Sequence, residues 1–242
     1  MSNGTYSEWL ELMEENSRNK QQAFMDDIAR RLKRPRTIEA PAHPYRGAPE
    51  YWQEFDWSLE ERLTWFTSNF ESAGGHVVRV ADMDGVRSFI SEKTEEMDAH
   101  YILQQNTSEL TALKLDEVLT NTQISVWNTD AEESWKARAA EADIGIVIAD
   151  YAVAYTGSIT VLSSPEKGRS VSLLPTALIA IIPLERLRTR LGEVLVEFDE
   201  AGQSQLPAGI HFISGPSRSA DIENDLTIGV HGPGIVFAVL VG

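Results

Sequence analysis

The sequence predicts an α/β domain with a mainly parallel central sheet, on three observations. Short β-rich segments alternate with amphipathic helical segments from residue 58 to residue 150, which is the order that βαβ units produce. The stretches "IGIVIAD" (144–150) and "ALIAIIP" (177–183) are continuous apolar runs, typical of parallel strands buried on both faces. A chain of 242 residues, 42% hydrophobic and 24% charged, can also bury one core without disulfides.

Residues 1–57 are predicted to form an N-terminal helix followed by a proline-rich arm. Phe24, Ile28 and Leu32 recur at helical spacing, and "RRLKRPR" places basic residues at the helix C-terminus before Pro35 ends it. We interpret this helix as docked on the domain or on a partner protein, in preference to a nucleic-acid contact. The arm combines four prolines with aromatic residues and is expected to pack through Tyr45, Tyr51, Trp52 and Trp57.

Residues 58–242 are predicted to form the α/β domain. "SLEE" (58–61) is a capping box that opens a helix ending at Gly74-Gly75. The segments expected next are a strand at 76–81, a helix at about 84–97, a strand at 101–105, a short helix at about 111–120, a strand at 123–127, a helix opened by "DAEE" (130–133) and ending near 142, and the strand at 144–150.

After residue 150 the pattern changes. "GSITVLSS" (157–164) and "SVSLL" (170–174) are two β-like segments around "PEKGR", which predicts a β-hairpin from Gly157 to Leu174. Pro165 suits the second position of its turn, and Gly168 can take a positive φ. A strand at 177–183 follows, then a helix starting at Pro183 and a polar surface loop at 199–209. The strands "IHFI" (210–213) and "IVFAVLVG" (235–242) close the chain.

Composition excludes several classes of function. The chain has no cysteine, which rules out disulfides, thiol nucleophiles and an iron–sulfur cluster held by this chain. Its net charge of −16 disfavours binding to nucleic acid or anionic membranes. The five histidines show no metal-binding spacing, so no metal is expected. No Walker A, dinucleotide-binding or serine-hydrolase motif is present. No segment is apolar enough to cross a membrane and no secretory signal is recognisable, so we expect a cytoplasmic protein.

"SGPSRSADIE" (214–223) is the strongest candidate for anion binding. Ser214, Gly215, Ser217 and Arg218 supply hydroxyls, an open backbone and a bidentate cation, and a short helix could begin at Ser219. A purely structural interpretation has equal weight: the stretch could be only a strand-to-helix turn that binds no anion. Glu223 is a candidate acid within the same stretch.

Three further loops could join the same pocket. "GVHGP" presents His231, a candidate proton-transfer group, next to Gly232 and Pro233, although a lone loop histidine is more often structural. "YTGS" offers Thr156, Gly157 and Ser158. The predicted hairpin turn offers Lys167, Gly168, Arg169, Ser170 and Ser172. The sequence therefore predicts an anion pocket shared by these loops, with Arg169 and Arg218 as its cations.

The motifs GRSxSLLP (168–175) and SGPSxxADIE (214–223), in this order, resemble the lactate-utilization domain family, most strongly over residues 143–242. The resemblance implies a fold similar to the sugar-phosphate isomerase and CoA-transferase group. It also implies a role in bacterial oxidation of L-lactate to pyruvate, beside two partner proteins that carry iron–sulfur clusters. The chain itself would hold no cofactor, which fits its lack of cysteine.

One position departs from the family pattern. Many relatives carry an acidic residue before the small-Gly-small turn, where this chain has Tyr155. The CoA-transferase group uses a glutamate as its covalent nucleophile, so the absence of one at this turn lowers the expectation of transferase chemistry. Three functions stay open at this point. They are an anion-binding component of lactate utilization, a structural or regulatory subunit without its own site, and an independent enzyme acting on sugar phosphates or acyl-CoA.

Overall fold

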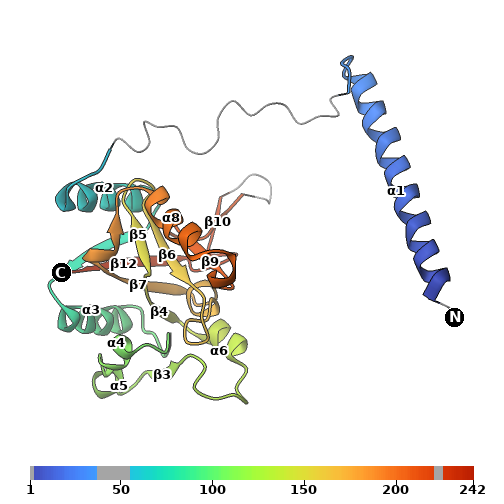
Figure 1. Ribbon diagram of the computed structural model, residues 1–242. Coiled ribbons are helices and arrows are strands. Elements are labelled where there is room, and N and C mark those ends of the chain that lie inside the picture. Colours follow the sequence, from blue (N-terminus) through green and yellow to red (C-terminus); the bar gives the residue numbers. More distant parts are fainter. Residues whose placement is uncertain (1–2, 37–54, 221–225) are drawn as a thin grey trace. The chain divides into compact units, whose positions relative to one another are not determined.

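The structure is a computed structural model that describes residues 3–36, 55–220 and 226–242 (Figure 1). The chain divides into two compact units, residues 1–54 and 55–242. The first unit contains the helix α1 (Asn3–Arg31), which ends on Arg30 and Arg31 as the basic sequence there predicts. Tyr45, Tyr51 and Trp52 lie outside the described residues. All other elements belong to the second unit.

The centre of the second unit is a six-stranded parallel sheet (Figure 1). Its strand order is β1-β12-β7-β4-β2-β3, and every neighbouring pair is parallel. The strands are β1 (His76–Val80), β2 (Tyr101–Gln104), β3 (Gln123–Val126), β4 (Ile144–Ile148), β7 (Ala177–Pro183) and β12 (Ile235–Val241). The prediction of an α/β fold with a mainly parallel central sheet is thus confirmed.

Each face of this sheet buries its own apolar core. On one face, Ile102, Ile146 and Ile179 pack under α3 (Met83–Glu96), α4 (Ser108–Thr111) and α5 (Leu115–Val118). On the other, Leu103 and Val147 pack under α2 (Leu59–Ser72), α6 (Trp135–Glu141) and α7 (Ser170–Leu173), together with a second sheet. Alternate residues of one strand face opposite cores, which explains why these strands are apolar throughout.

The second sheet has the order β8-β5-β6-β9. It consists of β5 (Tyr151–Val153), β6 (Ser158–Leu162), β8 (Leu187–Arg188) and β9 (Ile210–Ile213), and the helix α8 (Leu191–Ala201) follows β8 in the chain. β6 is antiparallel to both β5 and β9. A separate two-stranded ribbon pairs β10 (Arg218–Ser219) with β11 (Thr227–Ile228).

The hairpin predicted from Gly157 to Leu174 is wrong in its second half. Residues 170–173 form the helix α7, and β6 finds its partners in β5 and β9. The reason is close packing, since a Cβ on Gly145 of β4 would stand 2.1 Å from the carbonyl oxygen of Val171. Gly168 has no positive φ either; a Cβ there would stand 2.0 Å from the ring of Trp127.

Three helix starts also differ from the prediction. Pro183 ends β7 and is followed by a short 3-10 turn and β8, because residues 187 and 188 pair with β5; α8 begins only at Leu191. The helix expected after "DAEE" starts at Trp135. Ser219, where a helix could begin, lies in β10 and pairs with Thr227.

Candidate functional site

The topology singles out the crevice between β2 and β4. The chain leaves β2 toward α4 on one face of the sheet, and it leaves β4 toward the second sheet on the other face. In open parallel sheets, ligands bind beyond the carboxyl ends of the strands, at the point where neighbouring connections go to opposite faces. We therefore call the carboxyl ends of β2 and β4, with the residues that directly follow them, the switch crevice.

Gln105 bridges the two strands of the switch crevice. Its backbone N–H donates to the carbonyl oxygen of Ile146 at 3.1 Å, and its side-chain Oε1 accepts from the N–H of Ile148 at 2.9 Å. The residue is fully buried. Its Nε2 has no hydrogen-bond partner among the residues that the structure describes.

Asp150, two residues beyond the end of β4, forms an ion pair with Lys167. Asp150 follows β4, and its Oδ1 accepts from Lys167 Nζ at 2.6 Å while its Oδ2 accepts from the N–H of Leu162 at 2.8 Å. Only 16% of the Asp150 side chain and 23% of the Lys167 side chain are exposed. Water screens such a pair far less than it screens a surface pair.

Residues 163–169, here called the covering segment, lie over the carboxyl ends of β2 and β3. The N–H of Asn106 donates to the carbonyl of Glu166 at 3.0 Å. Trp127 Nε1 and Asn128 Nδ2 both donate to the carbonyl of Pro165, at 3.1 and 3.0 Å. These bonds hold the segment against the ends of β2 and β3. Within it, Ser164 and Lys167 exchange backbone hydrogen bonds of 3.2 and 3.1 Å, so Pro165 does occupy the second position of a turn, although no second strand follows.

Charged side chains from both faces of the sheet meet at the switch crevice. Hydrogen bonds from its own backbone N–H and from Ser108 lower the pKa of Glu109, and the charges of Arg186 and Lys167 lower it further. Arg186 donates to the carbonyl of Ala149 at 2.7 Å. Two acidic side chains, Asp150 and Glu109, therefore lie within electrostatic range of two basic ones, Lys167 and Arg186.

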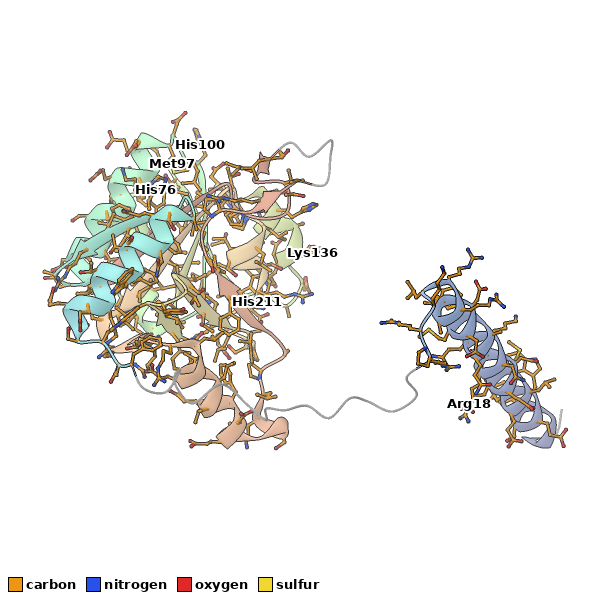
Figure 2. All side chains as sticks on the ribbon, turned by 90° about the horizontal axis from the view of Figure 1, so that it is seen from above. Arg18, His76, Met97, His100, Lys136 and His211 are labelled. Atoms are coloured by element: carbon orange, nitrogen blue, oxygen red, sulfur yellow. The ribbon has the colours of Figure 1, made fainter. Side chains whose placement is uncertain are left out.

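The rim of the crevice carries a histidine and an arginine. Ser163 Oγ and His211 Nε2 are 3.2 Å apart, and Arg169 is exposed beside them. Burial, and to a lesser extent the positive charge of Arg169, lower the pKa of His211. Both effects favour the neutral imidazole. In Figure 2, His211 lies apart from His76 and His100, which stand at the starts of β1 and β2.

The residues expected to form one anion pocket divide between the two ends of the sheet. Lys167, Gly168 and Arg169 belong to the covering segment at the carboxyl ends. Ser170 and Ser172 lie in α7, where the Ser172 hydroxyl is buried and donates to the carbonyl of Arg169 at 3.1 Å.

A second group lies at the amino ends, beside the C-terminus of α2. Ser158 Oγ and Ser214 Oγ are 2.8 Å apart. Gly157 and Gly215, both with positive φ, approach the backbone of residues 69–73 closely, and Thr156 is exposed at the same turn. The guanidinium of Arg218 donates to the carbonyl of Ala73, the C-cap of α2. Arg218 thus caps a helix C-terminus, where a cation is favourable.

The loop of residues 229–234 closes onto Ser217 at the same end. The N–H of Ser217 donates to the carbonyl of Pro233 at 2.9 Å, and the N–H of His231 donates to Ser217 Oγ at 3.3 Å. Gly232 packs against Ser217, and His231 is exposed. Glu223 lies outside the described residues. Lys167 pairs with Asp150 at the carboxyl ends of the strands, whereas Arg218 binds the carbonyl of Ala73 at the amino ends.

Sequence reasoning missed Gln105, Glu109, Arg186, Ser163 and His211. The sequence did carry a signal for Gln105: in "YILQQN" (101–106), three amide side chains follow directly after an apolar strand. The other four come together only through long-range packing.

A groove on the surface lies apart from the switch crevice. A groove of about 560 Å³ between α2 and β1 is lined by Leu63, Thr64, Thr67, Ser68, Glu71, Val77, Arg79 and Leu240. None of the residues expected at a site lines this groove. Within the described ranges, no group of three acidic or histidine side chains could hold a metal ion, and no helix could span a membrane.

Comparison with known proteins identifies the family. The family model of the LUD domain matches residues 63–241. Lactate utilization protein C of Halalkalibacterium halodurans is 35% identical over 217 residues, which cover 88% of this chain and 94% of that protein. Lactate utilization protein C of Shouchella clausii is 35% identical over 214 residues, covering 87% and 93%. A crystal structure of a DUF162 family protein from Deinococcus radiodurans shares the fold, with a TM-score of 0.57, 17% identity and coverage of 77% of this chain and 99% of that one. The chain belongs to the LUD domain family.

Proposed function

We propose that this chain is a cytoplasmic component of bacterial L-lactate utilization, contributing to the oxidation of L-lactate to pyruvate. The observation that carries the proposal is the similarity to lactate utilization protein C, which extends over 88% of the chain at 35% identity. Because the match includes nearly the whole length of that relative, the proposal applies to the complete α/β unit.

In this proposal the chain does not transfer electrons itself. It has no cysteine, so any iron–sulfur cluster needed for the oxidation belongs to partner proteins. We place two such partners beside this chain, as its family resemblance implies, and assign no cofactor to the chain. Its own contribution is to bind a small carboxylate.

The switch crevice is the place for that carboxylate. A net charge of −16 repels anions from the molecule as a whole, so a local group of cations is needed to attract one. Lys167 and Arg186 lie at the crevice and Arg169 lies at its rim. A bound carboxylate would take the place of Asp150 as the partner of Lys167.

Growth of the source organism tests the proposed pathway. We expect deletion of the gene to abolish growth on L-lactate while growth on glucose continues, and we expect the wild-type gene to restore it. Unimpaired growth of the deletion strain on L-lactate as sole carbon source would overturn the proposal.

Calorimetry on the purified chain tests the binding step. We expect L-lactate to bind, and we expect Lys167→Met to weaken the binding at least about tenfold, because a hydrogen bond to a charged group is lost. Lys114→Met is the matched control, since Lys114 is exposed and pairs with Glu117 away from the crevice. Equal loss of affinity in both variants would show that only net charge matters.

A further inference from the structure

We propose that Gln105 is a binding residue of the switch crevice and donates its side-chain N–H groups to the carboxylate of the bound ligand. This inference rests on the proposed function, because it concerns the same small carboxylate. It adds a residue that donates hydrogen bonds to the carboxylate oxygens of the ligand. Sequence motifs gave no role to this position.

The orientation of the Gln105 amide is fixed by its neighbour. Its oxygen accepts from the N–H of Ile148 at 2.9 Å, and a backbone N–H can only donate. The other amide atom is therefore Nε2, which carries two hydrogens. Neither finds an acceptor among the described residues, although the residue is fully buried.

Burying two unused donors is unfavourable, and native proteins avoid it unless the donors serve a purpose. An apolar side chain of similar length would fill the same space without that penalty. The unpartnered amide of Gln105, at a strand end where ligands bind in such sheets, is therefore available to an acceptor from outside the chain.

The position of the amide defines what it can bind. Its oxygen contacts the N–H of Ile148, the last residue of β4 and two residues before Asp150, so the amide lies at the switch crevice. Lys167 supplies a positive charge there, and Asp150 supplies an acceptor. A carboxylate oxygen fits the donors of Gln105 and Lys167, and a neighbouring hydroxyl fits Asp150 once Lys167 has turned to the ligand. The expected ligand class is a small 2-hydroxycarboxylate.

The adjacent residue provides a matched control. Gln104 is also buried, at 4% exposure, and its side-chain oxygen lacks a partner among the described residues. Successive residues of a strand point to opposite faces of the sheet, so Gln104 shares the face of Ile102 under α3 and α4, opposite to the face of Leu103. A general effect of removing a buried amide from β2 would appear in variants of either residue.

The test measures L-lactate binding by calorimetry for the full-length wild type, Gln105→Met and Gln104→Met. We expect Gln105→Met to weaken binding about tenfold to a hundredfold, because a hydrogen bond to a charged acceptor is removed. We expect the Gln104→Met affinity to stay within about twofold of wild type, since that side chain has no ligand contact. In the wild type, the Gln105 side-chain amide resonance should shift when L-lactate is titrated.

The outcomes separate this inference from the proposed function. If both variants bind L-lactate as the wild type does, or if the Gln105 resonance does not move, the amide serves a water molecule and the inference is overturned while lactate binding stands. If the wild type does not bind L-lactate at all, the proposed binding function fails and this inference fails with it. Should Gln105→Met not fold, the resonance titration of the wild type decides alone.

Discussion

The ion pair between Asp150 and Lys167 is expected to stabilise the fold measurably. We would compare wild type, Asp150→Asn, Lys167→Met and the double variant in a double-mutant cycle, which isolates the pairwise interaction. The two side chains are 16% and 23% exposed and their charged atoms are 2.6 Å apart, so the pair is a short charge-assisted hydrogen bond with little screening.

The magnitude follows from that geometry. A hydrogen bond to a charged group contributes about 1.5–3 kcal/mol to stability. The remaining exposure of both side chains places this pair toward the lower end, so we expect a coupling free energy of about 1.5–2 kcal/mol. Asp150→Asn alone should cost about 2–3 kcal/mol, because the N–H of Leu162 also loses a charged acceptor.

Urea unfolding at pH 7, followed by tryptophan fluorescence, measures each free energy of unfolding. A second cycle on Lys114 and Glu117 is the control, since that pair is 2.9 Å apart but its side chains are 62% and 54% exposed. We expect the coupling of the control pair to disappear in 1 M NaCl and that of Asp150–Lys167 to persist. Coupling energies that are equal for the two pairs would refute the reasoning.

Three other predictions concern stability. Gly168→Ala should lower stability by about 1–3 kcal/mol, because the new methyl group displaces the indole of Trp127. A hydrogen bond to Glu197, together with burial, raises the pKa of Tyr151 to about 12, so this tyrosine stabilises the fold below pH 10, and the contribution disappears as the pH rises through 12. The lowered pKa of His211 means that the folded state binds fewer protons than the unfolded state, so stability falls as the pH drops through 6.5.

Each of these has its own measurement. The melting temperature of Gly168→Ala should fall and its tryptophan fluorescence should change; an unchanged melting curve would show that Trp127 moves without cost. Absorbance at 295 nm should show one late-titrating tyrosine that Tyr151→Phe removes, and a titration identical in both proteins would contradict the assignment. His211→Asn should flatten the decline in melting temperature between pH 7 and pH 5. A slope as steep as that of the wild type would assign the decline to other groups.

The sheet was predictable because its strands are buried on both faces. Ile144, Ile146 and Ile148 face one core and Val147 faces the other, and this leaves an uninterrupted apolar run that the sequence displays directly. The capping box at Ser58 was equally local, since its two hydrogen bonds join residues three apart.

The misassigned segments have non-local causes. "SVSLL" carries no signal for a helix; it becomes α7 because Gly145, far away in the sequence, leaves space for the carbonyl of Val171. The sequence predicts Arg218 as an anion ligand, but its guanidinium donates to the carbonyl of Ala73 at the end of α2. Which loops lie close together depends on the order of the strands in the sheet. Hydrophobic periodicity does not reveal that order.

The residues of the candidate site also divide into those with a local signal in the sequence and those without one. Lys167 was found because it lies in a polar loop between two apolar runs. Gln105 was not found, because the orientation of its amide depends on a hydrogen bond from the N–H of Ile148, which lies 43 residues further along the chain. A residue at a strand end acquires its role from the neighbouring strand.

The fit of α7 against Gly145 has a consequence for ligand kinetics. The covering segment is fixed at one end by the bond from the N–H of Ser163 to Gly209, and at the other by α7, whose backbone touches β4 with no side chain between them. Both ends of the covering segment are therefore held, and the Lys167 side chain can turn away from Asp150 without movement of that backbone. Side-chain rotations take picoseconds to nanoseconds, whereas collective backbone movements take microseconds or longer. Association should thus occur in a single fast phase, with no slow opening step limiting its rate.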